Sequence, residues 1–469
     1  MSKQQVMTHS DKVKDKSSRP EALMYPDRIR SEMAGKTILV IGTSDHGAGY
    51  VWDVYRNIKL KVVLVTHKAL SDQESKVDTV IRYDYYNDQS DIDAHVDNII
   101  RLLGKQVLDI DGCFTFTEED TPITAVLCQK VGLRGVLPEA AMTVRSKQNT
   151  YDTLRSNGNK SLFDTEKYAP ISYRIRNEKD ITEAKKIKYP AVLKPENDAG
   201  SWGVTKVMSQ DDCLLQYNKL QKRFESSYFG GNFGKSMVLM EFLEGLSYNV
   251  DVVIYDGEFL AAFIADIGLY MSNRLVDTVT CHPTNLCMDF QQQLHTAAHQ
   301  SCCKVGLLHG VFNTEWKMTK SGPKLVEING RIGGYRRSIV YKTTHGVILW
   351  EIAAAIACGI KPSFPDISIR CFAVGTHLYS HLHGKQFLKK EVNAKLKNLA
   401  ESKSILLQMR HDTVDMHGDD KTFPIGFCHL VALSNTSIKH ARQKLLDLYR
   451  DLGFTETGYD VEQFTSVWA

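Results

Sequence analysis

The sequence lacks the features that would place it at once among membrane, secreted or nucleic-acid-binding proteins. No apolar run is long enough to cross a membrane, and residues 1–30 lack the apolar core of a signal peptide. Positive charge is not in excess either, because 58 basic and 55 acidic residues leave a net charge of only +3. A chain with this balance is not expected to bind nucleic acid as its main partner.

The ten cysteines also form no pattern. They include no C-x-x-C pair and no regular framework, so we expect reduced thiols in a cytoplasmic protein. The polar segment at residues 1–35 predicts a disordered or loosely attached tail. We expect no membrane partner, and the sequence leaves homo-oligomerisation open.

The glycine motifs of common nucleotide sites are missing as well. Gly42 and Gly47 have the first spacing of a P-loop, but Ala48 stands where the lysine should be. The dinucleotide pattern G-x-G-x-x-G is absent too. A glycine after a first strand more often lets the chain turn and pack closely. We therefore favour a structural role for this loop, with substrate contact as the alternative.

Strands and helices alternate in the first part of the chain. Buried-strand runs at Thr37–Ile41, Lys61–Thr66 and Ile110–Thr115, with a helix at Thr121–Val131, predict a parallel α/β domain over residues 36–140. The pattern changes over residues 141–370, where closely spaced strands predict antiparallel sheets of the α+β kind. These strands are expected at Ala191–Lys194, Val204–Met208, Met237–Phe242, Tyr248–Tyr255, Phe259–Asp266, Gly310–Met318 and Lys324–Asn329.

Helices are expected at Asp211–Arg223, Gln291–Val305 and His345–Cys358, and a Ser-Gly-Pro turn is expected at residues 321–323. Residues 371–469 predict a smaller α/β subdomain, with a strand near Phe427–Ser434 and a helix near Ser437–Gly453. The predicted fold class is therefore α/β combined with α+β.

Two neighbouring strands carry a candidate metal site. Glu327 and Asn329 alternate with apolar residues on one strand, so they share a face, and the hairpin can place Glu315 beside them. Two carboxylates and an amide oxygen suit Mg²⁺, which completes its shell with waters and phosphate oxygens. The alternative is a solvated hairpin face. The following Arg331 can hold a phosphate or carboxylate in a forked contact, and Gly333 and Gly334 let the backbone approach a ligand.

Basic and acidic residues upstream suggest a nucleotide site. Lys194 ends an apolar strand, and the small residues around Ser201 could fold over a triphosphate, although a plain surface loop is the alternative. Backbone groups of Glu241, Phe242 and Leu243 could pair with an adenine edge. Glu244 could then bind ribose hydroxyls. Taken alone, that segment is more typical of a strand end with solvated acids, and Lys147 is ambiguous in isolation.

The order of these pieces, from Lys147 through Lys194-Pro and Met240–Glu244 to Glu315 and Glu327-Ile-Asn-Gly-Arg331, resembles the ATP-grasp superfamily. Within it the chain is similar to the catalytic half of animal carnosine synthases, and more distantly to bacterial L-amino acid ligases. The resemblance covers roughly residues 37–362, and more loosely the remainder. The similar stretches are Asp111–Thr115, Thr124–Gln129, Val250–Gly257, Leu260–Phe263, Gly310–Glu315 and Ala357–Pro362.

This resemblance implies an ATP-grasp fold and a ligase mechanism. Residues 36–140 would be the pre-ATP-grasp domain, residues 141–370 the ATP-grasp domain with a lid at about 190–245, and residues 371–469 a C-terminal subdomain. ATP and Mg²⁺, or Mn²⁺, would be the cofactors. A substrate carboxylate would become an acyl phosphate, which the amine of a second substrate would attack. The substrates would be an amino acid or β-amino acid and an amine, with a carnosine-like β-alanyl-histidine as one product.

The resemblance also assigns roles to single residues. Lys147 and Lys194 would bind ATP phosphates, and the metal ligands would be Glu315, Glu327 and Asn329. Arg331 would steady the acyl phosphate. Asp277, where the family more often has glutamate, would bind a substrate ammonium, and Tyr335 would help form the side-chain pocket. Gly330 replaces the usual proline and loosens the turn before Arg331.

Three functions follow as hypotheses. The first is a dipeptide-type ligase, the second an ATP-grasp ligase for a non-amino-acid carboxylate or amine, and the third a non-catalytic ATP-binding module. Asp277 favours the first, because a carboxylate suits an ammonium-bearing substrate. The pattern His377-x₃-His381-x-His383 could be mistaken for zinc ligands, but a strand end with partly buried histidines is the favoured interpretation.

Overall fold

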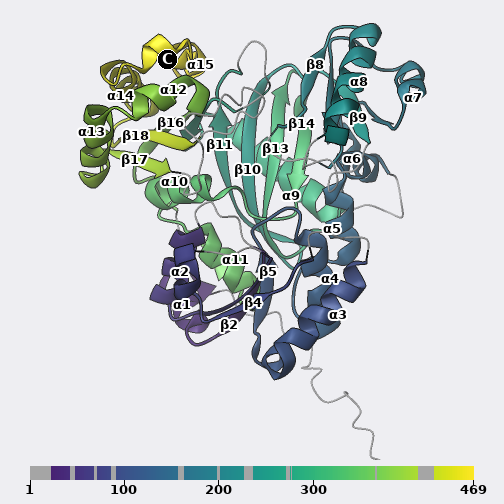
Figure 1. Ribbon diagram of the computed structural model, residues 1–469, viewed down its shortest axis with the longest axis vertical. Helices are drawn as coiled ribbons and strands as arrows, with labels where there is room; N and C mark the ends of the chain where they lie inside the picture. The colour runs from purple at the N-terminus through teal and green to yellow at the C-terminus, as the bar shows by residue number, and fades with distance from the viewer. Residues whose placement is uncertain are drawn as a thin grey trace, which may run out of the picture.

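The computed structural model describes residues 23–42, 48–67, 71–85, 91–156, 163–197, 201–226, 236–270, 275, 277–364, 367–409 and 427–469. Within these ranges the strands form one sheet of eight strands, two of four, and a short pair. Figure 1 shows the eight-stranded sheet in the middle, the N-terminal sheet below it, and helices around both. None of the helices in the described ranges could cross a membrane, since none is both long and apolar enough.

The N-terminal sheet is parallel and has the order β4-β3-β2-β5. Its strands are apolar because helices cover them, and the residues of β2 from Ile38 to Ile41 are fully buried. The strands are β2 (Thr37–Ile41), β3 (Lys61–Thr66), β4 (Thr79–Arg82) and β5 (Gly112–Thr115). The accompanying helices are α2 (Ala48–Asn57), η1 (Ser71–Lys76), α3 (Ile92–Leu103), η2 (Gly104–Asp109) and α4 (Thr121–Val131).

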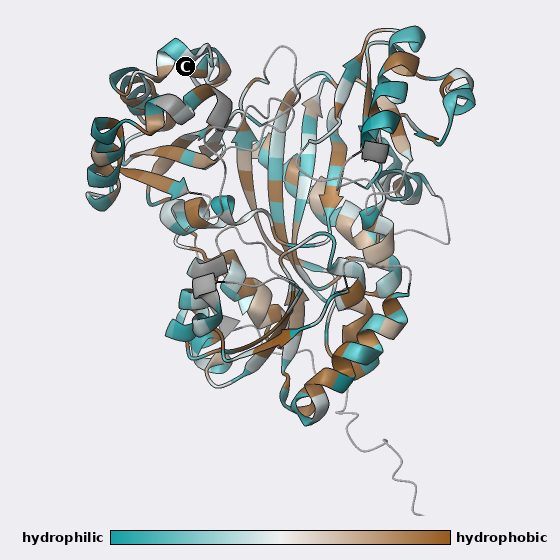
Figure 2. Ribbon diagram, viewed as in Figure 1, coloured by the Kyte–Doolittle hydropathy of each residue, from teal (hydrophilic) through white to brown (hydrophobic). Residues whose placement is uncertain are grey.

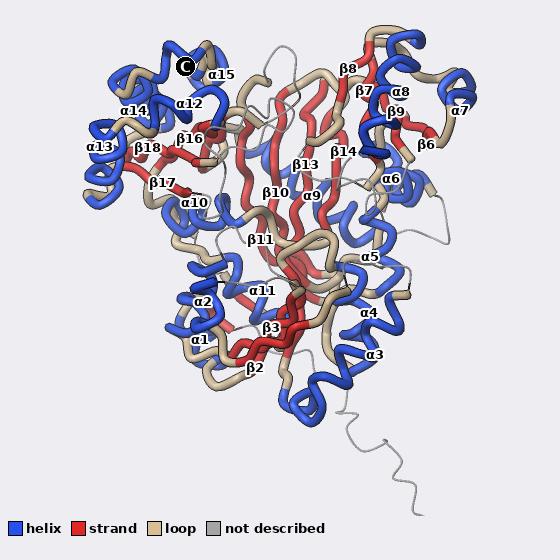
Figure 3. The backbone as a smooth tube through the Cα atoms, viewed as in Figure 1, coloured by secondary structure: helices blue, strands red, loops and turns tan. Residues whose placement is uncertain are grey.

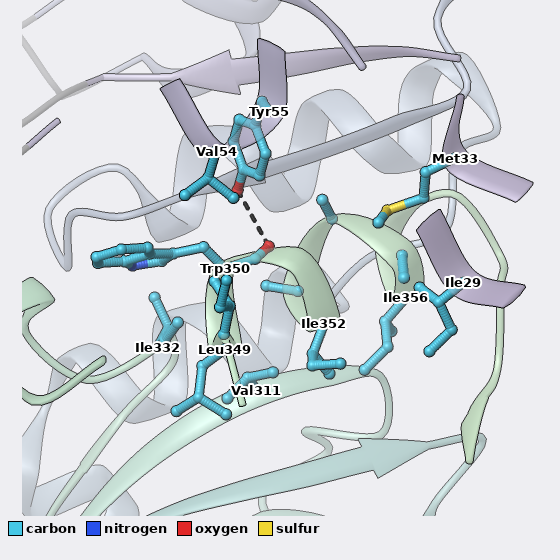
Figure 4. Packing of buried hydrophobic residues seen from close by; sticks show 14 of the residues in the cluster. Ile29, Met33, Val54, Tyr55, Val311, Ile332, Leu349, Trp350, Ile352 and Ile356 are labelled. Atoms are coloured by element: carbon cyan, nitrogen blue, oxygen red, sulfur yellow. Dashed lines mark hydrogen bonds between the residues drawn. The ribbon is translucent and has the colours of Figure 1, made fainter. Parts of the chain in front are cut away.

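The chain enters this domain earlier than the sequence suggested. Residues 23–35 were expected to belong to the tail, but they form β1 (Leu23–Met24) and α1 (Asp27–Met33). Ile29 and Met33 are fully buried, because α1 packs on α11 (Leu349–Ala357) (Figure 4). The Tyr55 hydroxyl donates to the Trp350 carbonyl at 3.1 Å in the same core. Residues 1–22 lie outside the described ranges.

A second, antiparallel sheet has the order β6-β9-β7-β8. Its strands are β6 (Ser172–Ile175), β7 (Ala191–Pro195), β8 (Thr205–Val207) and β9 (Met237–Glu241), and α7 (Glu178–Glu183) and α8 (Gln210–Ser226) lie against it. The core between them includes Leu193, Leu239 and Leu220. This unit contains most of the segment that was expected to form a lid.

The central sheet has the order β14-β13-β10-β11-β12-β16-β18-β17. One face packs on α9 (Met288–Lys304), which buries Trp316, Leu325 and Ile328. The opposite face is polar toward one end, with Asn249 and Asp251, and apolar toward the other, where Val253, Phe263 and Val311 pack on α11. Figure 2 shows hydrophilic and hydrophobic bands alternating along these strands. The strands are β10 (Leu246–Tyr255), β11 (Glu258–Ile267), β12 (Val279–His282), β13 (Gly310–Thr319), β14 (Gly322–Asn329), β16 (Phe372–Leu378), β17 (Ile405–Met409) and β18 (Cys428–Ser434).

Two predicted boundaries were wrong, both at glycines. The β13–β14 hairpin turns at residues 320–321, and Gly322 and Pro323 already belong to β14. Pro323 is tolerated because β14 is the edge strand, where a missing N–H breaks no ladder. The predicted helix His345–Cys358 begins at Leu349 instead, because Gly346 adopts a left-handed conformation (φ +75°) that ends α10 (Tyr335–His345).

The C-terminal residues continue the central sheet. β16 pairs with β12, β18 with β16, and β17 with β18, so the sheet continues across residue 370 (Figure 3). The helices around them are α12 (Ser380–Phe387), α13 (Lys390–Glu401), α14 (Ile438–Asp451), η4 (Phe454–Thr457), α15 (Val461–Phe464) and η5 (Ser466–Trp468). The remaining elements are α5 (Pro138–Arg145), α6 (Lys147–Arg155), η3 (Glu166–Tyr168) and β15 (Pro362–Ser363).

Candidate active site

A cavity of about 290 Å³ lies where the second sheet, the polar face of the central sheet and the C-terminal strands come together. Many of the residues predicted for the site lie on its wall. These are Lys147, Lys194, Ser201, Glu241, Phe242, Leu243, Asp277, Glu315 and Glu327. The wall also includes residues that the sequence did not indicate, namely Val192, Pro195, Val204, Met240, Tyr270, Leu275, Lys317, Val326, Arg336, His377 and Tyr379.

Two carboxylates face each other on the floor of the cavity. Glu315 on β13 is the direct cross-strand partner of Glu327 on β14, and Asn313 is the partner of Asn329. Burial raises the pKa of Glu315 to about 7, and the negative charge of Glu327 adds to the effect. The Asn329 amide donates to Asn313 Oδ1 at 3.1 Å, so its own Oδ1 stays on the acceptor side. The predicted trio of oxygen donors is thus brought together.

A β-bulge beside Glu327 shapes this floor. The register shifts between Glu315 and Trp316, so Val326 has no cross-strand partner on β13. Its carbonyl accepts hydrogen bonds from Lys194 Nζ at 3.1 Å and from the Tyr151 hydroxyl. Lys194 Nζ also donates to the Tyr151 oxygen at 3.1 Å. The bulge therefore anchors one of the two lysines on the wall.

Both lysines are buried cations with local support. Lys147 is the first residue of α6, whose N-cap Ser146 accepts from the Asn149 N–H at 3.0 Å. Lys147 Nζ lies 2.9 Å from Glu327 Oε1. Lys194 is only 3% exposed, and burial lowers its pKa although Glu327 and Glu315 oppose the shift. The pair places positive charge directly above the two carboxylates of the floor.

The Glu196 carboxylate connects the N-cap of α6 to the second sheet. It is 3% exposed and pairs with Arg174 of β6 at 2.6 Å, and it accepts from Ser236 Oγ at 2.8 Å and from Ser146 Oγ. Hydrogen bonds from Arg174 and these hydroxyls outweigh burial and lower the pKa of Glu196. Residues 198–200, part of the predicted phosphate loop, lie outside the described ranges.

The segment after β9 forms an apolar slot. Met240, Val192, Val204 and Val326 line it together with Phe242, whose ring lies 4.3 Å from Lys206 Nζ. The Glu241 N–H already donates to the Ile171 carbonyl at 2.9 Å, and the Glu241 carboxylate accepts from the Ile171 N–H at 2.7 Å. The N–H of Glu241 is therefore unavailable to a nucleotide. Glu244 is exposed and is absent from the described cavity wall.

The far part of the cavity is strongly charged. Burial raises the pKa of Asp277, opposed by Arg337 and Lys317, and burial lowers the pKa of Lys317 to about 8. His377 on β16 faces Arg336 of α10, with Arg336 Nη1 at 3.1 Å from Nδ1. Burial, Arg336 and Arg337 lower the pKa of His377 to about 3, so the ring is neutral at physiological pH.

Several predicted residues lie behind the wall. Arg331 reaches Glu118 Oε2 at 3.4 Å and Asn329 Oδ1 at 3.3 Å, and it lines a smaller cavity of about 70 Å³. Gly333 was expected to approach a ligand, but its N–H donates to Asp251 Oδ1 at 2.9 Å, and a Cβ there would lie 2.4 Å from that oxygen. The glycine therefore makes room for buried Asp251. Gly334 is the N-cap residue of α10. The Tyr335 side chain is not among those that the structure describes.

The three histidines of the H-x₃-H-x-H pattern are divided between elements. His377 lies in β16, whereas the other two begin α12, so the pattern is not a single strand end. His383 is buried, and its Nε2 lies 2.6 Å from the Tyr449 hydroxyl. The side chain of His381 lies outside the described residues.

One missed residue had a signal in the sequence. Glu118 follows β5, at the carboxyl end of a parallel strand, which is where α/β sheets bind ligands. Burial raises the pKa of Glu118, with Arg331 and Arg145 opposing the shift. Arg336, His377 and Lys317 had no comparable local signal, because only the tertiary fold gathers them.

The carboxylate pair fits a divalent cation. Within the described part of the chain no group of three or more His, Cys, Asp or Glu side chains has the arrangement of a metal site. Two carboxylates with a neighbouring amide are nevertheless the sparse oxygen set that Mg²⁺ uses when phosphate oxygens and waters complete its shell. Burial and the facing negative charge of Glu327 raise the pKa of Glu315, and a cation bound between the two carboxylates would favour the ionised form of both.

Comparison with known proteins also indicates an ATP-grasp domain. Residues 187–339 match the model of the ATP-grasp domain family. Carnosine synthase 1 of Mus musculus is 30% identical over 93% of this chain and 53% of that protein, and the Homo sapiens protein gives the same figures. Alanine–anticapsin ligase of Bacillus subtilis is 24% identical over 61% of this chain and 62% of that protein. The chain spans about half the length of the carnosine synthases it matches.

Solved structures share the architecture. L-Amino acid ligase from Bacillus licheniformis superimposes with a TM-score of 0.71 at 17% identity, covering 89% of this chain and 97% of that one. An ADP complex of N5-carboxyaminoimidazole ribonucleotide synthetase gives 0.66 at 14% identity, covering 90% and 98%. The predicted fold class is confirmed, and the predicted likeness to the ATP-grasp family is confirmed for residues 187–339. Residues 187–339 are therefore an ATP-grasp domain, and the chain around them has the ATP-grasp fold.

Proposed function

We propose that this protein is an ATP-dependent carboxylate–amine ligase that joins two amino-acid-like substrates through an acyl phosphate. The observation that carries the proposal is the composition of one cavity wall. Two buried lysines, two facing carboxylates and the buried Asp277 all line the same space. The relatives named above are by name a synthase of carnosine and a ligase of alanine with anticapsin, and they support the same reaction class.

The nucleotide occupies the part of the cavity next to β7 and β9. The apolar slot of Val192, Met240 and Val326 takes the adenine, with the Leu243 backbone at its edge. Glu244, which is exposed just beyond the described wall, is the proposed ligand of the ribose. Lys147 and Lys194 bind phosphate oxygens, beside Ser201. The Val326 carbonyl and Tyr151 hold Lys194 in place for this task.

Glu315, Glu327 and Asn329 would hold Mg²⁺ or Mn²⁺, and the ion would neutralise the negative charge of the phosphates. Lys147 already contacts Glu327 at 2.9 Å, so phosphate and carboxylate would share its charge. Arg331 approaches the same ligands from behind, through Asn329 Oδ1 at 3.3 Å, and steadies the transferring phosphoryl group. Most of the rate comes from positioning and charge, and no side chain has to act as a nucleophile.

Asp277 distinguishes the two ligase hypotheses. Its carboxylate is largely buried and interacts with the positive charges of Arg337 and Lys317. Such a carboxylate suits the ammonium of the substrate that is phosphorylated. Gly334 and Tyr335, at the start of α10, stay predicted substrate residues on the strength of the family resemblance alone. An amino acid or β-amino acid as carboxyl donor is therefore favoured over a carboxylate without an amine, and a carnosine-like product is one candidate.

Phosphate release from the purified protein with Mg·ATP tests the proposal. Amino acids, β-alanine and γ-aminobutyrate serve in pairwise mixtures with histidine and other amines, and mass spectrometry identifies condensed products. Release that requires both partners, with a condensed product, supports the ligase. ATP binding without release in any mixture favours substrates of another class. Glu183→Gln, on the exposed surface of α7, serves as the matched control for site variants.

A further inference from the structure

The part of the cavity away from β7 and β9 contains basic residues that have no role in binding the proposed nucleotide. Arg336 comes from the first turn of α10 and His377 from β16, so both reach the wall from the C-terminal side of the fold. The positive charges that act on the Asp277 carboxyl are those of Arg337 and Lys317. For the Glu315 carboxyl they are those of Arg337 and Lys194. Arg336 thus adds a permanent positive charge at a separate position on the wall.

The contact between Arg336 and His377 fixes the chemistry of the imidazole. A guanidinium can only donate, so His377 Nδ1 accepts from Arg336 Nη1 at 3.1 Å. The neutral ring then carries its proton on Nε2. No described residue accepts a hydrogen bond from that Nε2–H. The two side chains together offer a guanidinium and a neutral N–H donor, which is a suitable pair for a carboxylate.

Buried polar residues support this pair from below. His377, His429 and Gln408 are cross-strand neighbours on β16, β18 and β17, and the rings of His377 and His429 stack at 4.7 Å. Gln408 Nε2 donates to the Arg336 carbonyl at 3.2 Å, and Gln408 Oε1 lies 3.3 Å from His429 Nδ1. Both supports are buried, with His429 2% and Gln408 6% exposed. Gly375 leaves the room that His429 needs, since a Cβ there would lie 2.7 Å from Nε2.

We propose that Arg336 and His377 bind the carboxylate of the amino acid that supplies the amine, so that these two residues set the preference for this substrate over the matching simple amine. The proposal rests on the ligase function. The reacting carboxylate belongs near Lys147, Lys194 and the facing glutamates, where phosphate is transferred. A second anion therefore needs its own cation, and Arg336 lies in the first turn of α10, where the helix dipole also favours negative charge.

Matched amines with and without a carboxylate test this subsite. Ligation is measured with Mg·ATP and a carboxyl donor that the wild type accepts, using L-histidine against histamine, L-alanine against ethylamine and L-phenylalanine against phenethylamine. The wild type should use the amino acid of each pair with the higher kcat/KM. Arg336→Met should lower kcat/KM for the amino acids by about 10- to 100-fold, through KM, and leave the simple amines nearly unchanged.

Further variants keep the result interpretable. Arg336→Lys retains the charge and should recover part of the preference, and His377→Gln should lose a smaller share of it. Lys342→Met removes a cation from the exposed side of the same helix and should change nothing. An equal loss for both members of each pair in Arg336→Met, with Arg336→Lys no better, would overturn the subsite. A wild type without any pair-dependent ligation would instead contradict the ligation of amino acids, the proposed function on which the subsite rests, and would favour substrates of another class.

Discussion

Replacing Glu315 by glutamine should stabilise the metal-free protein while it abolishes ligation. Glu315 lies directly opposite Glu327 on the floor of the cavity, and burial and that neighbouring charge raise the pKa of Glu315 to about 7. Glutamine has nearly the same shape and no charge. The substitution therefore removes the repulsion between the two side chains and keeps the packing of β13 against β14.

The direction of the pH dependence follows from proton binding. The unfolded carboxyl ionises near pH 4.5 and the folded one near 7, so the folded state binds more protons in this window. The free energy of unfolding of the wild type therefore falls as the pH rises from 4.5 to 7. Each pH unit is worth about 1.4 kcal/mol, so the loss is on the order of 3 kcal/mol at pH 8. The glutamine variant avoids this loss, and near pH 4.5 the two proteins should be equally stable.

Urea unfolding in EDTA at pH 5 and pH 8 measures the difference. At pH 8 the variant should exceed the wild type by on the order of 1–3 kcal/mol, and Mg²⁺ with ADP should narrow the gap by neutralising the wild-type pair. Glu183→Gln, which loses only an exposed contact to Lys179 at 3.5 Å, should stay within about 0.5 kcal/mol at both pH values. A Glu315→Gln protein that is less stable than wild type at pH 8, or a difference independent of pH, would refute the reasoning.

Four further substitutions test other parts of the site. Glu327→Ala should abolish phosphate release and leave the circular dichroism spectrum unchanged; retained turnover would contradict the metal assignment. Arg331→Ala should lower kcat by about 100-fold or more and change ATP affinity by calorimetry far less; a collapse of ATP affinity alone would reassign Arg331 to the nucleotide. Asp277→Asn should raise KM for the carboxyl-donor amino acid by about 10- to 100-fold with the KM for ATP unchanged, whereas equal shifts in both would place Asp277 outside the substrate subsite. Gly375→Ala, whose Cβ would lie 2.7 Å from His429 Nε2, should lower stability by about 1–3 kcal/mol in thermal unfolding, and an unchanged midpoint would show that His429 can move aside.

The sequence predicted strongly patterned elements well. The strands Thr37–Ile41 and Lys61–Thr66 and the helix Thr121–Val131 have the predicted bounds, because uninterrupted apolar runs and a following glycine mark them. The errors arose where the position of a segment in the tertiary structure, and not its own residue pattern, decides its secondary structure. Pro323 taken alone predicts a turn, but a proline is tolerated in a strand at the edge of a sheet. The segment of α1 was predicted as part of a polar tail, although its two buried apolar side chains suffice to pack it on the core.

The candidate site likewise contains some residues that local sequence motifs predicted and others that only the fold brings together. The nucleotide and metal residues occur in short local motifs, and the structure brings Lys147, Lys194, Glu315 and Glu327 to one wall. Arg336 and His377 lie 41 residues apart and meet only because β16 pairs with β12 beneath α10. The bulge at Val326 and the use of the Gly333 N–H by Asp251 were equally invisible, since alternation of residue types does not report register.

The helix α11 has a consequence for how the chain is made. Residues from Leu349 to Ile360 complete the core beneath β2, β3 and α1, and β1 pairs with β15 at Pro362. One face of the N-terminal sheet is buried by α3 and α4, but the other face cannot be buried on the ribosome until more than 200 further residues have followed β5. At a synthesis rate of about 5–20 residues per second, this interval is about 10–50 s, long enough for exposed apolar strands to aggregate. We expect the nascent chain to depend on chaperones that hold its first domain until α11 arrives.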